Sequence, residues 1–300
     1  MKSNRRQFLQ SAGLATGAVM FGNRLSGFAA DAPKRPVSAA DLVSLGQSGL
    51  KVSRLSLGTG MKGGQRASNH TRMGQKKFTE LVRGAHERGS RFFDLADMYG
   101  THEYFASAMS GVPRDEYAFT TKIWWNKGGI PEPERPDADV VVKRFLKELK
   151  TDHLDLVLLH CVTSAKWTTD LSRPMELLAG LKKQGIVRAH GVSCHSLASL
   201  RSAAQEPWVD SIHARINPYG ARMDGEPAVI LEVLKEAKQN GKGVVGMKII
   251  GEGTYRDDVE KKRASVRLAL TCGCVDVLLV GCETLTELDE IRSLMGEVST

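Results

Sequence analysis

Short apolar runs rich in β-branched and aromatic residues alternate along the chain with longer segments in which apolar residues recur every three to four positions. Runs of the first kind predict strands, and the second pattern predicts amphipathic helices. We expect eight strands, at residues 54–58, 91–96, 117–122, 154–160, 187–193, 211–217, 243–249 and 275–281. Segments between them fit helices, among them residues 76–89, 139–150, 174–185, 197–205, 227–241 and 262–273.

The regular alternation of strand and helix indicates the fold class. Strands separated by helices of this length pair in parallel, and eight such units are the number that closes a barrel. Two short strand-like runs flank the turn sequence GQSG at residues 46–49, which predicts a hairpin ahead of the first barrel strand. No GxGxxG motif follows that strand, so nothing indicates a doubly wound dinucleotide-binding sheet. The sequence therefore predicts an α/β fold, a (β/α)8 TIM barrel with an N-terminal β-hairpin.

The residues ahead of the barrel differ from it in composition. Residues 1–30 contain two adjacent arginines, then Phe-Leu and a weakly apolar stretch rich in glycine and alanine, which is typical of a twin-arginine (Tat) export signal. That stretch is too short for a membrane span, which needs about 20 largely apolar residues. Residues 31–41 (DAPKRPVSAAD) are expected to be a linker, and residues 42–300 the barrel domain.

This N-terminal pattern also predicts where the protein acts. We expect it to engage the Tat translocase and to be exported to the periplasm or cell envelope, with no stable membrane span in the mature chain. The alternative is a cytoplasmic protein whose first residues form a disordered basic tail.

Composition narrows the possible partners. The chain has 300 residues, 41% of them hydrophobic and 25% charged, which is typical of a globular protein with one large core. Four basic residues and no acidic ones lie in residues 1–30, and they account for half of the formal net charge of +8. Basic residues further along are interleaved with acidic ones rather than clustered. We therefore expect a small-molecule substrate and no nucleic-acid partner.

The five cysteines do not form a recognisable framework. Their number is odd, and there is no CxxC pair, so we expect buried apolar thiols rather than disulfides. Cys161, Cys194 and Cys282 nevertheless come directly after predicted strands, on the face where barrel enzymes carry out their chemistry. No usual ligand spacing appears among them, so no metal site is predicted.

Polar residues close several of the predicted strands. Asp94 and Tyr99 follow the second strand, and Lys122, His160 and Ser193 close the third, fourth and fifth. Each one has an ordinary structural explanation, such as a helix cap or a buried core histidine. Together they are more informative, because the carboxyl ends of barrel strands meet at one face and carry the catalytic groups.

These residue types suit proton transfer to a carbonyl oxygen. A tyrosine hydroxyl has a pKa near 10, and we expect the ammonium of Lys122 to lower the pKa of Tyr99 toward the working range. The carboxylate of Asp94 would hold that ammonium, and the imidazole of His160 would orient the carbonyl. Reduction also needs a hydride, which no side chain provides, so a nicotinamide cofactor is implied.

Several segments, LGQSGLKVSRLSLGTG, FFDLADMYG, FTTKIWW, LKTDHLDLVLLH and GVSCH, resemble the aldo-keto reductases between about residues 45 and 290. This resemblance implies a (β/α)8 barrel that reduces aldehydes or ketones with NAD(P)H. The tetrad of that family, in the order Asp, Tyr, Lys and His, falls on Asp94, Tyr99, Lys122 and His160, with Tyr99 as the general acid.

The cofactor contacts implied by the resemblance depart from the family pattern. After the fifth strand, relatives usually have a Ser-Asn pair, whereas this chain has Ser193-Cys194. After the sixth strand, relatives commonly have a glutamine, whereas this chain has Asn217. Where relatives place a tyrosine that stacks on the nicotinamide, this chain has Met247, followed by Lys248. Gly251 and Gly253 are the glycines that we expect to approach the cofactor phosphates. Gly281, at the end of the eighth strand, stands at a position where relatives bind the 2′-phosphate.

The preference for NADP or NAD is predicted from the loop after the eighth strand. Glu287 lies where NADP-binding relatives carry a basic residue, and an unpaired acid would repel a 2′-phosphate. Unless Lys248 or Arg292 compensates for this acid, we expect dual or NAD-leaning use.

The residues after Lys122 suggest a substrate pocket. Trp124 and Trp125 follow it at the expected mouth of the barrel and would wall a pocket for an apolar carbonyl compound. Two other functions stay open, namely a catalytically weak cofactor-binding sensor or accessory subunit, and a metal-dependent hydrolase using His160, His195 and the cysteines at the strand ends. The first is favoured by the altered cofactor contacts, and the second lacks a convincing ligand set.

Overall fold

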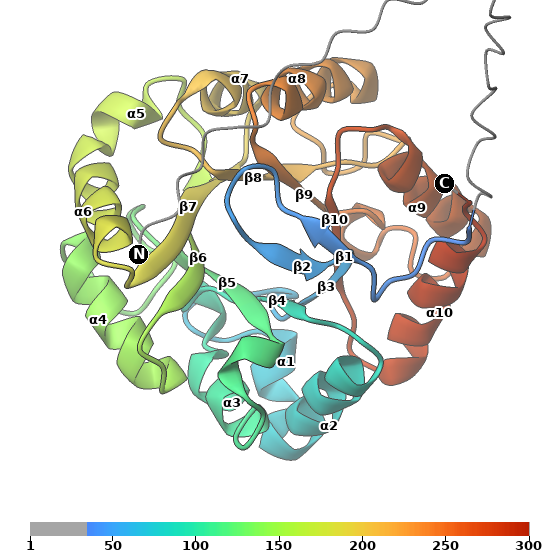
Figure 1. Ribbon diagram of the computed structural model, residues 1–300, viewed down its shortest axis with the longest axis horizontal. Helices are drawn as coiled ribbons and strands as arrows, with labels where there is room; N and C mark the ends of the chain where they lie inside the picture. The colour runs from blue at the N-terminus through green and yellow to red at the C-terminus, as the bar shows by residue number, and fades with distance from the viewer. Residues whose placement is uncertain (1–34, 300) are drawn as a thin grey trace, which may run out of the picture. The chain divides into compact units, whose positions relative to one another are not determined.

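A computed structural model describes residues 35–299 as a closed barrel of eight parallel strands (Figure 1). The order around the barrel is β10-β3-β4-β5-β6-β7-β8-β9. All eight predicted strands are confirmed, as β3 Leu55–Gly58, β4 Phe92–Asp94, β5 Ala118–Ile123, β6 Leu154–Val162, β7 Val187–Cys194, β8 Ser211–Arg215, β9 Gly243–Met247 and β10 Val277–Gly281. The export signal predicted for residues 1–30 lies outside the described residues.

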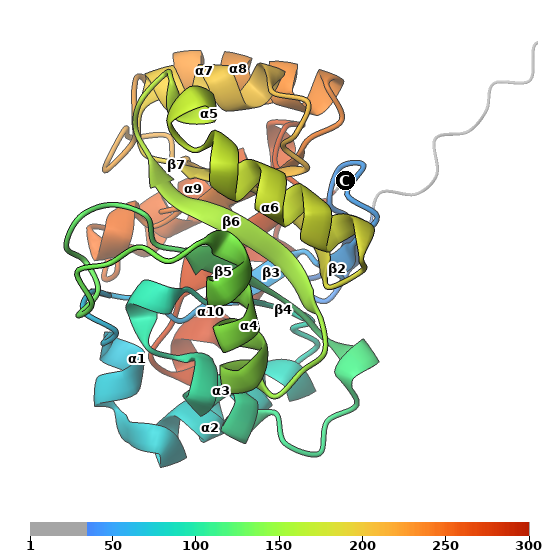
Figure 2. The ribbon, with the colours of Figure 1, turned by 90° about the vertical axis from the view of Figure 1, so that its left-hand side faces the viewer.

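Helices surround the barrel, and α4 and α6 lie along the outer side of β5 and β6 (Figure 2). The six predicted helices correspond to α2 Gly74–Glu87, α4 Ala138–Leu149, α6 Ser172–Lys183, α7 Leu197–Gln205, α8 Pro227–Gln239 and α9 Val259–Thr271. Outside those predictions lie α1 Asn69–Arg72, α3 His102–Ala108, α5 Trp167–Asp170 and α10 Leu285–Gly296, and three 3-10 turns, η1 Asp97–Tyr99, η2 Arg114–Glu116 and η3 Gly251–Gly253. The first three of these helices are too short to show a clear helical period.

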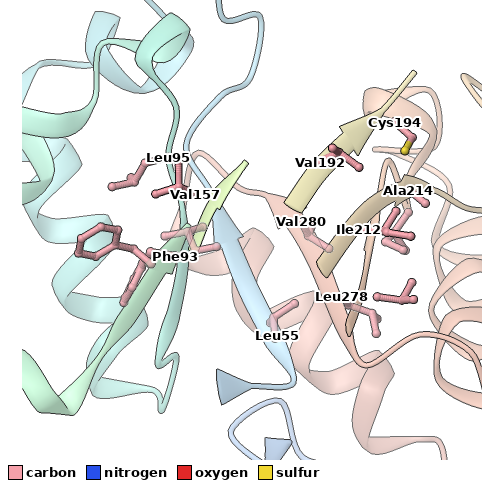
Figure 3. Close-up of a cluster of buried hydrophobic side chains, with 14 of the residues drawn as sticks. Leu55, Phe93, Leu95, Val157, Val192, Cys194, Ile212, Ala214, Leu278 and Val280 are labelled. Atoms are coloured by element: carbon pink, nitrogen blue, oxygen red, sulfur yellow. The ribbon is translucent and has the colours of Figure 1, made fainter. Parts of the chain in front are cut away.

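Successive residues of each strand face opposite sides of the barrel wall. In β6, Val157 and Leu159 belong to the apolar layer between strands and helices, whereas Leu156 and Leu158 belong to the cluster inside the barrel. Figure 3 shows part of the outer layer, including Phe93, Leu95, Ile212 and Leu278. This alternation makes the last inward position of each strand available for a polar side chain.

The predicted N-terminal hairpin closes the amino end of the barrel. Strands β1 (Leu42–Ser44) and β2 (Lys51–Ser53) pair antiparallel, and the turn between them packs against the start of β9. The backbone N–H of Gln47 donates to the carbonyl of Gly241 at 2.8 Å. Leu45 and Val52 are fully buried in the cluster inside the barrel. The interior is therefore sealed at the end opposite to the strand carboxyl ends.

The described part of the predicted linker, residues 35–41, is bound to the barrel. Val37 is buried in the outer apolar layer, and its N–H donates to the carbonyl of Val298 at 2.8 Å. The carbonyl of Ala39 accepts from the N–H of Leu55, the first residue of β3. The expectation of a linker here is corrected, because apolar side chains in this segment gain burial by packing on the core.

Gly46 provides a test of this sealing turn. Its φ is +53°, and a Cβ there would lie 2.2 Å from the backbone nitrogen of Gly243. We expect Gly46→Ala to lower the free energy of unfolding by about 1–3 kcal/mol, through backbone strain and overpacking. Gly180→Ala is the control, because a Cβ at Gly180 in α6 meets nothing within 4 Å. Denaturant titration that found the two variants equally stable would contradict this role.

Candidate active site

Four polar side chains meet inside the carboxyl end of the barrel. Asp94 ends β4, Lys122 lies near the end of β5, His160 in the last part of β6 and His213 in the middle of β8. Each is at most 4% exposed, in positions that alternate with the outward apolar residues of the same strand. Three of these four were predicted from the strand ends, and His213 was not.

Asp94 and Lys122 form a buried ion pair. The Lys122 Nζ lies 2.5 Å from Oδ1 of Asp94 and donates a second hydrogen bond to the carbonyl of Leu95 at 2.8 Å. Burial lowers the pKa of Lys122, against the opposing effect of Asp94. Burial alone would raise the pKa of Asp94, but Lys122 and then His213, whose Nε2 lies 3.4 Å from Oδ1, outweigh it and leave this pKa lowered. The carboxylate thus serves as counterion to a buried ammonium.

Tyr99 is held by the short turn η1. Asp97, at the start of this turn, is buried and bonded to Arg66 Nε at 2.8 Å and to Arg144 at 2.6 Å. The Tyr99 ring packs against the backbone of Gly60, where a Cβ would lie 2.4 Å from ring atoms. These contacts fix the phenol from a segment outside the barrel strands.

The phenol of Tyr99 lies beside Lys122 and His160. The Lys122 Nζ is 4.9 Å from the centroid of the Tyr99 ring, and the rings of Tyr99 and His160 meet edge to face at 5.6 Å. The expected lowering of the Tyr99 pKa is not found. Burial has the largest effect and raises this pKa well above its ordinary value, and the carboxylate of Asp94 raises it further. The ammonium is already paired, so Tyr99 is a protonated phenol here.

His160 is neutral in this environment. Burial lowers the pKa of its imidazole well below the usual value, and the neighbouring charge of Lys122 lowers it further. Its Nδ1 is buried and has no hydrogen-bond partner among the described residues. The backbone carbonyl of His160 accepts from Nε1 of Trp125 at 2.6 Å. A neutral imidazole can donate one N–H to an oxygen atom without carrying charge.

Next to His160 lies a chain of polar contacts that sequence reasoning did not assemble. Cys161 has a positive φ of 57°, and its Sγ lies 3.3 Å from Nε2 of His195. Arg215 donates to Nδ1 of His195 at 2.5 Å and pairs with Asp224 at 3.0 Å. Because Nδ1 accepts from the guanidinium, the imidazole proton is on Nε2 and points to the sulfur. Burial raises the pKa of Cys161 to about 11, so it is a thiol.

A cavity of about 390 Å³ opens at this end of the barrel and reaches Asp94 and Tyr99. It continues along the ends of β9 and β10 to η3, α9 and α10. Four of the residues predicted to contact a cofactor line it, namely Met247, Lys248, Gly253 and Gly281. Gly251, the first residue of η3, is buried and does not line the cavity.

Ser193 and Asn217 are placed differently from the prediction. The Oγ of Ser193 accepts the N–H of Cys161 at 2.9 Å, and the residue is 1% exposed. The Asn217 amide is fully buried, donates to the carbonyl of Ala221 at 2.8 Å, and its oxygen accepts two backbone N–H groups of the same turn. The expectation that Asn217 presents its amide to a cofactor is corrected, since that amide is used to shape its own loop.

The two tryptophans after Lys122 border His160 rather than the cavity. The ring of Trp124 meets that of His160 at 5.4 Å, and its Nε1 donates to the carbonyl of Gly128 at 2.5 Å. Trp125 packs against the outer apolar layer while holding the His160 carbonyl. Only Trp124 therefore retains a position from which it can contact a substrate near His160.

Charges at the outer end of the cavity are balanced. Glu287 is paired with a cation that the sequence did not predict. The two predicted candidates have other partners, since Lys248 binds Glu252 and Arg292 binds Asp289. Arg256, which follows η3, pairs with Glu287 and also with Glu283 at 2.9 Å. The unpaired acid expected from the sequence is thus a paired one.

The residues missed by sequence reasoning left different signals. Ser211, His213 and Arg215 occupy alternate positions of β8, with apolar outward residues between them, and this polar alternation marks an unusual barrel interior. Arg256 left no signal, because its acidic partners come from a segment distant in sequence.

Among residues 35–299, no helix has the length and apolar character to cross a membrane. Nor do any three or more histidine, cysteine, aspartate or glutamate residues in this range form a group that could hold a metal ion.

The chain is similar to several proteins that are named as reductases. The chain is 32% identical over 143 residues to methylglyoxal reductase DkgB of Salmonella typhimurium, an alignment covering 46% of this chain and 51% of that protein. It is 25% identical over 204 residues to the NADH-specific methylglyoxal reductase of Escherichia coli, covering 61% of each. The chain thus spans about half to three fifths of these curated relatives.

The fold has a solved counterpart. A putative aldo-keto reductase from Pseudomonas aeruginosa superposes with a TM-score of 0.70 at 24% identity, covering 87% of this chain and 96% of that one. The model of the aldo/keto reductase family matches residues 54–293, which is nearly the whole barrel. The chain belongs to the aldo/keto reductase family.

Proposed function

We propose that this protein is an NAD(P)H-dependent oxidoreductase that reduces an aldehyde or ketone to an alcohol, with Tyr99 as the general acid. One observation carries the proposal: Asp94, Tyr99, Lys122 and His160 converge at the carboxyl end of the barrel, where a cavity reaches Tyr99. Family membership supports the same reaction class.

Each of the four side chains has a part in the proposed proton transfer. Tyr99 is a buried phenol and donates its proton to the oxygen of the carbonyl group as negative charge develops there. The ammonium of Lys122, 4.9 Å from the ring, stabilises the resulting phenolate, and Asp94 keeps that ammonium in place. The neutral imidazole of His160 donates an N–H to the same oxygen and orients it.

The lining of the cavity fits a nicotinamide cofactor, which when bound would supply the hydride for the carbonyl carbon. Met247, 8% exposed, lines the same cavity as Tyr99, and a polarizable thioether suits the face of a flat ring. Further out, Lys248, Arg256 and Lys262 also line the cavity, each paired with an acidic side chain that a diphosphate would displace. The open backbone at Gly253, where a Cβ would meet nothing within 4 Å, allows close approach of phosphate.

The substrate proposal is a small carbonyl compound. Relatives named as methylglyoxal reductases suggest that methylglyoxal and related oxoaldehydes belong in the first substrate panel. Trp124, beside His160, would provide the apolar wall for such a compound.

Tyr99→Phe tests the proton donor. We expect kcat for carbonyl reduction to fall by about 10²–10⁴-fold, because the phenol proton is removed while the ring remains. Cofactor affinity, measured by fluorescence titration, should stay within about twofold. Tyr104→Phe is the matched control, because Tyr104 packs on Phe78 and does not line the cavity. A variant as active as wild type, or a wild type inactive on the whole panel, would overturn the proposal.

For the cofactor we propose NADH, or equal use of NADH and NADPH. Arg256 is the cation nearest to Glu287 and is already bound by Glu283 and Glu287, so it is not free for a 2′-phosphate. The name of the NADH-specific relative is consistent with this preference.

Dissociation constants of the two cofactors check this preference. We expect wild type to bind NADH at least as tightly as NADPH, and Glu287→Gln to tighten NADPH binding on the order of tenfold by removing one of the two carboxylates that bind Arg256. Glu297→Gln serves as control, because Glu297 pairs with Arg263 and does not line the cavity. A strong NADPH preference in wild type would contradict the assignment.

We also propose that residues 1–30 direct the protein through the twin-arginine pathway to the periplasm or cell envelope, leaving a single barrel domain. The two adjacent arginines and the Gly- and Ala-rich stretch support this proposal. A folded enzyme exported by this route would carry its cofactor across with it.

A reporter fusion tests the export proposal. Residues 1–40 fused to a fluorescent protein should reach the periplasm in cells with the twin-arginine translocase and remain inside in cells without it. Replacing Arg5 and Arg6 by lysine should also retain the reporter. Export that persists without the translocase, or retention in both strains, would refute this assignment.

A further inference from the structure

Cys272 and Cys274 lie at the end of the barrel opposite to the cavity, in the connection from α9 to β10. Cys272 is the C-cap of α9, which ends at Thr271, and Cys274 is three residues ahead of β10. Their sulfur atoms are 3.4 Å apart, with the thiol of Cys274 donating to the sulfur of Cys272. Neither residue takes part in the proposed carbonyl reduction.

The backbone between the two cysteines permits the sulfurs to approach. Gly273 has a φ of +73°, a left-handed conformation that glycine adopts at no steric cost, and a Cβ there would meet nothing within 4 Å. The residue is exposed, so the turn can adjust without displacing packed neighbours.

The two thiols differ in access and in acidity. Cys272 is partly exposed, whereas Cys274 is completely buried. The hydrogen bond from Cys274, and after it the backbone N–H groups around Cys272, lower the pKa of Cys272 to about 6, against the opposing effect of burial. The pKa of Cys274 is raised, first by its bond to Cys272 and then by burial. This asymmetry gives one accessible thiolate and one adjacent thiol.

From this arrangement we propose that Cys272 and Cys274 form a thiol–disulfide exchange site, which is oxidised to a disulfide by small disulfides of the glutathione type. The Cys272 thiolate attacks one sulfur of the external disulfide, breaks its S–S bond and releases one thiolate. Cys274 then loses its proton and attacks the sulfur of Cys272, which releases the second thiolate. The external disulfide is reduced to two thiols, and the protein pair is oxidised to a disulfide.

The product of this reaction should be readily reversed. The closed ring contains only Cys272, Gly273 and Cys274, so it removes little entropy from the unfolded chain, and a tight ring of this kind favours reduction. The site is separated from the catalytic face by the length of the barrel strands. Oxidation should therefore leave cofactor affinity unchanged, and the proposal stands or falls independently of the proposed reductase activity.

The experiment exposes the reduced full-length protein to mixtures of reduced and oxidised glutathione, followed by acid quenching and alkylation with N-ethylmaleimide. Proteolysis before Asp276 separates the pair from Cys282, and mass spectrometry then counts the alkylated thiols on each peptide. In wild type we expect the peptide with Cys272 and Cys274 to lose two hydrogens and both alkylation sites. Burial raises the pKa values of Cys161, Cys194 and Cys282. These three thiols should therefore remain reduced, and they should be alkylated once the protein is unfolded.

Single variants separate the two steps. Cys274→Ser should accumulate a glutathione mixed disulfide on Cys272, because the resolving thiol is absent, whereas Cys272→Ser should take up no glutathione. Cys282→Ser is the matched control and should close the disulfide as wild type does. The proposal is overturned if folded wild type retains both thiols at every glutathione ratio, or if a mixed disulfide on Cys272 persists in wild type.

Discussion

The candidate site depends on the ion pair between Lys122 and Asp94 inside the barrel. An ammonium at this depth loses its hydration, a cost of several kcal/mol that only a counterion and well-placed hydrogen bonds can offset. Asp94 supplies the charge at 2.5 Å, and the carbonyl of Leu95 supplies a second acceptor. The charge of Lys122 in turn helps to keep His160 neutral, and the ammonium lies beside the ring of Tyr99. Removing either partner would leave a buried unpaired charge, so the pair constrains the neighbouring side chains.

The barrel and this pair could be predicted from sequence because both follow from local periodicity. Alternation along a strand places Asp94, Lys122 and His160 on the inward side, and parallel pairing brings their strand ends together. His213 was missed because only the strand ends were considered, whereas it lies inside β8. Asn217 was misplaced because it was assigned to the end of this strand, whereas β8 ends at Arg215 and the amide belongs to the following turn.

Contacts between distant segments could not be predicted. The pKa of Tyr99 depends on how deeply η1 is buried and on the direction in which the Lys122 ammonium points, and neither has a sequence signature. Arg256 meets Glu283 and Glu287 only because the η3 turn reaches over to the start of α10. The charge balance of the cavity is therefore a property of the tertiary structure, and a single acidic residue at one aligned position describes it incompletely.

The two ends of the barrel differ in what they give the buried ion pair access to. At the amino end, Leu45 and Val52 of the hairpin and its turn are fully buried in the apolar cluster inside the barrel and lie between that end and the ion pair. At the carboxyl end, Asp94 and Tyr99 line the cavity, whereas Lys122 lies behind them. In the proposed reaction, a proton donated by Tyr99 would therefore be replaced through the cavity, the same space in which we place cofactor and substrate. Closure of one end of the barrel would thus set the route of that proton exchange at the other.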